Sequence, residues 1–211
     1  MRWLTNLLWI ALGIAGLIAP LNLRYVTYAL LPAGAVLGVL IAAAGFAAMT
    51  QEPVAYVLPL GLPDLPFHVR IDALSAFFLT LLGLAAAGIS IFYAGYLRAG
   101  EDNSPGLTCL QYHLFLASIA AIFIADDGYL FMVAWETMAL SSYFLVTTSH
   151  RIAEIRRAGF LYLLIAHIGA IALLLCFGVM HGAGGDYSFD ALRASELPVF
   201  WASTAFLLNE P

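Results

Sequence analysis

Charged residues divide this chain into apolar stretches that are long enough to cross a membrane. The hydrocarbon core of a bilayer is about 30 Å thick and a helix rises about 1.5 Å per residue, so roughly 20 apolar residues make one crossing. We predict six full spans, at residues 3–19, 28–49, 73–97, 110–125, 129–148 and 158–180. A seventh apolar stretch, residues 200–208, would rise only about 14 Å and cannot cross alone. The pattern predicts an all-α, polytopic transmembrane helical bundle.

Two connections between the predicted spans are longer than the others. Residues 51–70 contain four prolines around short apolar pieces, which is typical of an extended loop that can form a hairpin. Residues 181–198 begin with several glycines and then read Ser188-Phe-Asp-Ala-Leu-Arg, which predicts a short capped helix at the membrane interface.

Composition strengthens the membrane assignment. The 211 residues are 63% hydrophobic and only 10% charged, whereas soluble domains carry about 25% charged residues. A compact water-soluble domain is therefore excluded. The net charge is −5 and the chain has eight arginines and no lysine, so it lacks the basic stripe of a nucleic-acid-binding protein. We expect no nucleic-acid partner, and the lipid bilayer as the solvent for most of the surface.

The arginines predict that the N-terminus lies outside, because basic residues concentrate in the inner loops of membrane proteins. In that orientation the inner loops carry Arg24, Arg98, Arg151, Arg156 and Arg157. The outer segments carry Arg2, Arg70 and Arg193. A secretory signal is the alternative interpretation of the first stretch, but five more spans follow it.

Glu136 is the one charge that we predict deep within the membrane. It follows Gly128 by eight residues, which places it about 12 Å into the hydrocarbon. An ionised carboxylate there costs roughly 2.5–3.5 kcal/mol. Glu136 must therefore pair with a cation, line a hydrated cavity or take up a proton, and proton relays use such groups. The alternative is a protonated Glu136 that donates a hydrogen bond and locks two helices together.

His167 is the second candidate for proton transfer. The spans that hold Glu136 and His167 are joined by a short basic loop, and their predicted depths differ by only one to two turns. A neutral imidazole near a buried carboxylate makes a workable relay pair, whereas the alternative is a histidine that hydrogen-bonds across a helix interface. We expect His113 to be interfacial, Asp72 to be a helix-terminal acid, and Ser141 to bond to its own helix.

The sequence offers no catalytic centre. Cys109 and Cys176 stand apart on separate apolar segments and form no metal-ligand cluster. Haem b requires facing histidines at matched depths, and only His113 and His167 lie in or near spans, at different depths. We find no phosphate-binding loop and no Ser-His-Asp grouping. We therefore expect no cofactor and no metal in this chain.

Three segments carry a family resemblance. Val133-Ala-Trp-Glu-Thr-Met-Ala-Leu-Ser-Ser-Tyr-Phe-Leu-Val resembles the fifth helix of the antiporter-like subunits of respiratory complex I and its hydrogenase relatives. Arg156-Arg-Ala-Gly-Phe-Leu-Tyr-Leu-Leu-Ile-Ala-His-Ile-Gly follows at the family's distance. With Arg70-Ile-Asp-Ala-Leu-Ser-Ala-Phe-Phe-Leu, the match is most like the hydrogenase-4 component B branch, which includes a formate hydrogenlyase subunit.

The resemblance implies a function and a set of partners. In the family, the glutamate that matches Glu136 faces a lysine on helix seven and tunes its proton affinity, and His167 matches a polar position beside that route. The expected protein is a proton-translocating subunit of a hydrogenase or quinone-reductase complex in a bacterial or archaeal inner (cell) membrane. Its partners would be other membrane subunits, and electron transfer would occur elsewhere in the complex.

This sequence departs from the family at its end. The family's helix seven continues through Gly-Phe-Gly-x-Lys-Ala-Gly, whereas this chain ends with Phe206-Leu-Leu-Asn-Glu-Pro. We therefore interpret residues 1–211 as the N-terminal part of one antiporter-like domain, either a fragment or a frameshifted product. The rival hypotheses are a structural scaffold that transports nothing, a subunit of a cation/proton antiporter, and a quinone- or haem-binding enzyme.

Overall fold

The computed structural model describes residues 3–18, 23–63, 65–99, 105–184, 187–194 and 203. Its helices and strands, in chain order, are α1 (Trp3–Ile18), α2 (Leu23–Tyr25), the π-helical turn η1 (Val26–Leu30), α3 (Leu31–Ala48), β1 (Val54–Leu62), β2 (Leu65–Ile71), α4 (Ala73–Ala99), α5 (Pro105–Ile124), α6 (Gly128–Val146), α7 (Ala153–Gly184) and α8 (Phe189–Ala194).

The predicted helical architecture is confirmed in its coarse form. Among the described residues, five helical segments are long and apolar enough to cross a membrane: Val26–Ala48, Ala73–Arg98, Pro105–Ile124, Gly128–Val146 and Ala153–Gly182. They match the predicted second to sixth spans. The described part of α1 has 16 residues and falls short of that length. The predicted seventh stretch, residues 200–208, lies outside the described residues except for Ser203.

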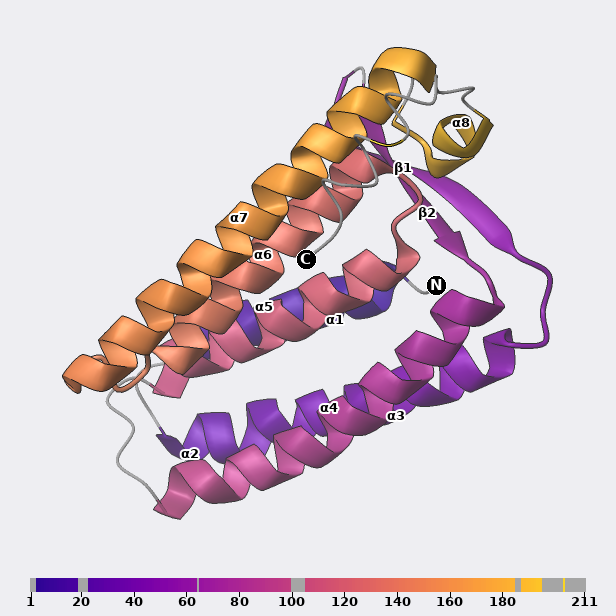
Figure 1. Ribbon diagram of the computed structural model, residues 1–211. Coiled ribbons are helices and arrows are strands. Elements are labelled where there is room, and N and C mark those ends of the chain that lie inside the picture. The colour runs from indigo at the N-terminus through magenta and orange to yellow at the C-terminus, as the bar shows by residue number, and fades with distance from the viewer. Residues whose placement is uncertain are drawn as a thin grey trace.

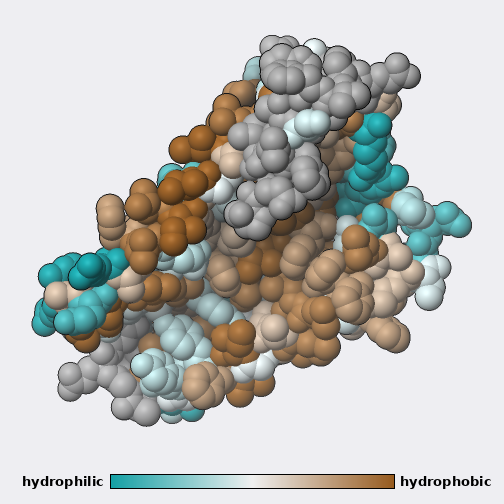
Figure 2. All heavy atoms as spheres, in the orientation of Figure 1, coloured by the Kyte–Doolittle hydropathy of each residue, from teal (hydrophilic) through white to brown (hydrophobic). Residues whose placement is uncertain are grey.

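The long helices pack in three pairs (Figure 1). α3 packs along α4, α1 along α5, and α7 along α6, while α5 joins the last two pairs by contacting α6. The two strands and α8 gather at one end of the bundle, which we call the hairpin end (Figure 1). On the face that Figure 2 shows, hydrophobic residues cover much of the described surface between the ends. This distribution is that of a multi-pass membrane protein.

Glycines allow the close approach of α3 and α4. A Cβ added to Gly83 would lie 2.5 Å from the backbone nitrogen of Ala42 and 2.5 Å from the carbonyl oxygen of Gly38. No other residue therefore fits at position 83 without moving a helix. Small residues serve the same purpose in membrane helices generally, because helix association there depends on close van der Waals packing.

An arginine stabilises the start of the α3 segment. η1 has π-helical geometry, which disrupts the regular hydrogen bonding of the helix. The Nη2 atom of Arg98, near the end of α4, donates to the carbonyl oxygen of Thr27 at 3.2 Å. The same guanidinium lies 4.0 Å from the centre of the Tyr28 ring. Arg98 thus ties the ends of two helices together, at the end of the bundle opposite the hairpin.

The proline-rich loop forms the β-hairpin that its sequence indicated. β1 and β2 pair antiparallel, with Val54 opposite Ile71 and Leu58 opposite Phe67, and a bulge lies between Leu58 and Gly61. Gly61 has a φ of 110°, a backbone conformation that favours glycine. Val69 of β2 also pairs with Ala125 after α5, which anchors the hairpin to the bundle.

Candidate functional site

Asp127 fixes the start of α6, the helix that carries Glu136. Its side chain accepts hydrogen bonds from the backbone N–H groups of Leu130 and His68, and it is 2% exposed. The first bond caps the helix and the second ties it to β2. This cap was not among the predictions from the sequence. The available signal was an aspartate directly before an apolar run, which is typical of a helix N-cap.

Glu136 and His167 meet across the interface between α6 and α7. The Oε2 atom of Glu136 lies 3.6 Å from Nε2 of His167, and the side chains are 35% and 44% exposed. The expected similarity in depth is therefore present in the structure. At 3.6 Å the two groups are in ion-pair range, and a direct proton transfer requires them to approach to about 2.6–3.2 Å or to share one water.

The hydrogen bonding of His167 determines which of its two ring nitrogens carries the hydrogen when the ring is neutral. Nδ1 lies 2.9 Å from the carbonyl oxygen of Leu163, and a carbonyl only accepts, so Nδ1 carries a hydrogen. In neutral His167 the hydrogen is therefore on Nδ1, and Nε2 is an acceptor. In protonated His167 both nitrogens carry hydrogens. Nε2 can thus take a proton from Glu136 or return one.

The pair is surrounded by apolar side chains. Val133 and Leu140 of α6 are exposed, as are Leu164 and Ile168 of α7. Ser141, which follows Glu136 on α6, donates to the carbonyl oxygen of Thr137 at 2.6 Å, as predicted for it. Glu136 and His167 therefore form a partly open polar pair on an otherwise apolar surface, and ionised groups in such surroundings require a partner or a proton.

His113 is buried, and its predicted interfacial position is wrong. The side chain is fully buried, and Nδ1 lies 2.9 Å from the carbonyl oxygen of Cys109. α5 begins at Pro105, five residues before the predicted start, so His113 lies deeper than expected. Its ring packs against Gly34 of α3, where an added Cβ would lie 2.7 Å from Nε2. His113 faces α3 rather than the Glu136–His167 pair.

Asp72 is a helix-terminal acid, as predicted. Its Oδ1 atom accepts a hydrogen bond from the backbone N–H of Ser75 at 2.8 Å. This bond lowers the pKa of the Asp72 carboxyl group, and weaker contributions include the charge of Arg70. Asp72 therefore stabilises the first turn of α4.

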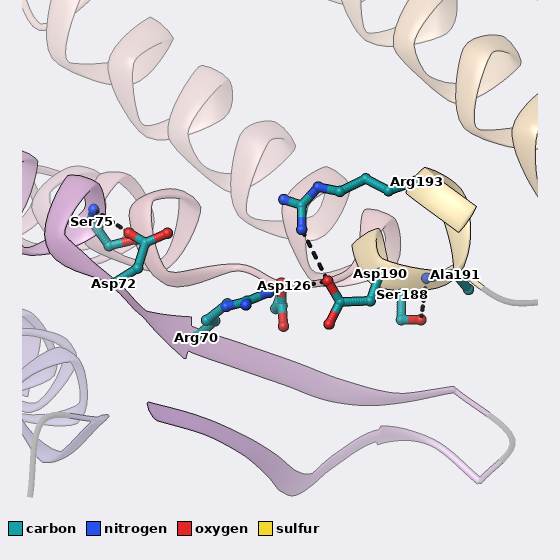
Figure 3. Close-up of polar contacts among 8 residues, drawn as sticks. All are labelled: Arg70, Asp72, Ser75, Asp126, Ser188, Asp190, Ala191 and Arg193. Atoms are coloured by element: carbon teal, nitrogen blue, oxygen red, sulfur yellow. Dashed lines mark hydrogen bonds and ion pairs between the residues drawn. The ribbon is translucent and has the colours of Figure 1, made fainter. Parts of the chain in front are cut away.

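A second polar cluster lies at the hairpin end (Figure 3). Nη1 of Arg70 lies 3.1 Å from Oδ1 of Asp190 and 3.8 Å from Oδ1 of Asp126. Arg193 holds the same Asp190 oxygen at 3.0 Å. Burial raises the pKa of Asp126, and the nearby Arg70 charge partly offsets this effect. Arg70 and Arg193 were predicted on the same side of the membrane, but their contacts with Asp126 and Asp190 were not predicted.

Among the described residues, no group of three or more histidine, cysteine, aspartate or glutamate side chains is placed so that it could hold a metal ion. Cys109 and Cys176 are buried as free thiols.

Comparison with known proteins supports the family resemblance. Residues 125–209 match the family model described as "NADH:quinone oxidoreductase/Mrp antiporter, TM". The chain is 33% identical to hydrogenase-4 component B of Escherichia coli over 140 residues, which is 66% of this chain and 21% of that protein. It is 28% identical over 118 residues to a putative antiporter subunit, mnhA2, of Staphylococcus epidermidis, covering 56% of this chain and 15% of that protein.

Two solved membrane complexes contain chains of similar fold. A chain of the Mrp complex from Dietzia sp. DQ12-45-1b superposes with a TM-score of 0.78 at 19% identity, covering 98% of this chain and 22% of that one. A chain of the membrane-bound sulfane sulfur reductase, an archaeal respiratory complex, gives a TM-score of 0.72 at 19% identity, covering 98% of this chain and 32% of that one. This chain thus spans about a fifth of the length of the first curated relative that it matches.

Proposed function

We propose a role in proton translocation for this chain, which belongs to the superfamily of antiporter-like membrane subunits of complex I, Mrp antiporters and hydrogenases. The observation that carries the proposal is the contact between Glu136 and His167 in the middle of two membrane helices. A carboxyl group and an imidazole that approach from 3.6 Å to hydrogen-bond distance, or that share one water, can hold one proton between them. In hydrocarbon, an ionised group without a partner carries a high energetic cost.

The proposed step is the transfer of one proton. The O–H bond of protonated Glu136 breaks and an N–H bond forms at Nε2 of His167, which leaves a carboxylate beside an imidazolium. Return of the proton restores two neutral groups. No electrons are exchanged, so the redox chemistry of the complex would belong to other subunits.

Glu136 retains an open side through which a further charge could act. About a third of its side chain is exposed, between Val133 and Leu140. A cation from a neighbouring helix would stabilise the carboxylate there and favour release of its proton. The family resemblance implies a lysine for this role. We propose that such a cation, approaching and withdrawing, drives the proton between Glu136 and His167.

We propose membrane subunits of a hydrogenase or NADH:quinone-oxidoreductase type of complex as the partners. The match to hydrogenase-4 component B supports this choice. A subunit of a cation/proton antiporter is the second candidate, which the similarity to mnhA2 and to the Mrp complex supports. Sodium dependence of the transport would favour the antiporter. The arginine distribution supports an inner (cell) membrane orientation in which the N-terminus and the hairpin end face outward.

The proposal is tested by Glu136→Gln in membrane vesicles that contain the chain in its native assembly. The matched control is Glu154→Gln, which changes an exposed glutamate in the first turn of α7. We expect Glu136→Gln to lower proton uptake at least tenfold with normal assembly, and Glu154→Gln to leave it unchanged. Normal uptake by Glu136→Gln would leave only the scaffold hypothesis.

A further inference from the structure

Aromatic side chains fill the interface between α6 and α7 on the hairpin side of Glu136. The Phe131 and Phe177 rings contact each other edge to face, with centroids 5.9 Å apart. A Cβ added to Gly128, at the start of α6, would lie 3.2 Å from the Phe177 ring, so the ring packs directly on the helix backbone. Phe131 precedes Glu136 by five residues, or about 7.5 Å along the helix.

α8 adds a third ring at the same place. The Phe189 ring lies 6.1 Å from that of Phe177 and 6.5 Å from that of Phe131. We call these three side chains the aromatic lid. All three are partly buried, and none has a polar side-chain atom that could bind a water molecule. Narrow constrictions lined only by such groups exclude water.

Polar contacts hold α8 over this position. The backbone N–H of Phe189 donates to the carbonyl oxygen of Asp126 at 3.0 Å, and that of Gly128 donates to the carbonyl oxygen of Tyr187 at 2.9 Å. Arg70 of β2 reaches Asp190 of α8 from the other side (Figure 3). The hairpin, the start of α6 and α8 are therefore joined at the lid.

The other half of the interface differs in chemistry. Beyond Glu136, away from the hairpin end, α6 and the turn that follows it carry six hydroxyl side chains: Thr137, Ser141, Ser142, Tyr143, Thr147 and Thr148. The Cγ2 methyl group of Thr147 and the ring of Tyr143 pack directly on Gly159 of α7, where an added Cβ would lie 2.3 Å and 3.3 Å from them. A hydroxyl that donates to its own helix retains acceptor lone pairs for water.

We propose that the aromatic lid closes the interface between α6 and α7 to water at the hairpin end, so that the Glu136–His167 pair exchanges protons with the opposite end. The statement about proton exchange rests on the proposed proton-transfer function. The closure to water rests only on the packing of the three aromatic rings. Arg70 and Asp190 act as positioning residues, because they hold α8 and with it Phe189.

Cysteine accessibility in the full chain, in its membrane, tests the closure. The background carries Cys109→Ala and Cys176→Ala, and Glu136→Cys supplies the single thiol. A small membrane-impermeant methanethiosulfonate reagent is applied to each side in turn. Tyr56→Cys in the hairpin and Glu154→Cys at the opposite end, each tested separately, report which side the reagent reaches, because both positions are exposed.

We expect the thiol at position 136 to react at least tenfold faster from the side of Glu154 than from the hairpin side. Phe131→Ala or Phe189→Ala should raise the hairpin-side rate at least tenfold, and Arg70→Ala should raise it by loosening α8. Phe77→Ala, which removes an exposed ring of α4, is the matched control and should change neither rate.

Fast reaction from the hairpin side with the lid intact would overturn the proposal, as would no reaction from either side. An unchanged hairpin-side rate in Phe131→Ala and Phe189→Ala would also overturn it. These readouts are independent of transport. If one-sided access were found while Glu136→Gln transported normally, the proton-transfer function would fail and the closure would stand.

Discussion

The Glu136 carboxyl group lies 3.6 Å from Nε2 of His167, and these atoms join two neighbouring membrane helices at mid-length. The bond from His167 Nδ1 to the Leu163 carbonyl leaves Nε2 as the nitrogen that would exchange the proton in the proposed step. His167→Gln should therefore reduce proton transfer without abolishing assembly, because glutamine retains polarity but does not titrate. Proton uptake by vesicles, normalised to assembled complex, measures the effect.

The close contact between α3 and α4 predicts very different outcomes for two glycines of the same helix. Gly83→Ala places a methyl group 2.5 Å from the backbone of α3, and backbone atoms cannot move without separating the helices. We expect a loss of roughly 1–3 kcal/mol or more in unfolding free energy, as for overpacking in general. Unfolding in mixed detergent micelles is the measurement.

Gly88→Ala is the control for this change. Nothing lies within 4 Å of a Cβ at position 88, so the substitution should be neutral or should stabilise α4 by up to about 1 kcal/mol through helix propensity. Equal destabilisation by both substitutions would contradict the α3–α4 packing.

Arg98 should contribute to the stability of the end opposite the hairpin. Arg98→Ala removes a charged hydrogen bond to the Thr27 carbonyl and a cation–π contact with Tyr28. We expect a loss of roughly 1–2 kcal/mol, reduced by solvent at this exposed position. Arg98→Lys keeps the charge but loses the planar geometry and should recover only part of the loss. Full recovery by lysine would show that charge alone matters.

Asp127 should be more sensitive to truncation than to loss of charge. Asp127→Ala removes the cap of α6 and the bond to His68, and we expect it to cost about 1–2 kcal/mol. Asp127→Asn retains one acceptor oxygen for the cap, but its NH2 group cannot accept from the His68 N–H, so it should lose that bond and still cost less than Asp127→Ala. Thermal unfolding of the two variants under identical conditions distinguishes the effects, and equal losses would contradict the capping role.

The first turn of α4 should open in acid. Asp72 has a lowered pKa in the folded chain, so its ionised cap adds stability above the unfolded value of 3.8. That stability is lost as the pH falls from 3.8 through the folded pKa. Amide hydrogen exchange at Ser75, corrected for its intrinsic rate, should rise in this window and lose its pH dependence in Asp72→Asn.

The pH dependence of stability that Asp126 contributes has the opposite sign to that of Asp72. Burial raises its folded pKa, so protonation favours the folded state and this group adds stability as the pH falls toward 3.8. Asp126→Asn should therefore leave the hairpin end at least as stable near neutral pH, provided that the Arg70–Asp190 contact persists.

Much of this arrangement follows from local sequence. Apolar runs predicted the five long helices because hydrocarbon requires continuous hydrogen-bonded backbone, and helix depth brought Glu136 and His167 to similar heights. The error at His113 arose because polar residues at the start of α5 suggested a later boundary, and five residues correspond to about 7.5 Å of depth.

Long-range contacts were not predictable in this way. Phe189 meets Phe131 because α8 folds back over the start of α6, and Arg70 finds Asp190 for the same reason. Hydrophobic periodicity specifies the face that a helix buries but not its partner. The predicted seventh stretch and the fragment interpretation remain predictions, as does the orientation in the membrane.

A double-mutant cycle of Glu136→Gln and His167→Gln tests the central claim most directly. Proton uptake is measured for both single variants and for the double variant in vesicles with equal amounts of assembled complex. If the two side chains act as one proton-transfer unit, the double variant should transport as slowly as Glu136→Gln alone and no slower. Multiplicative losses, or uptake at the original rate in Glu136→Gln, would contradict the account.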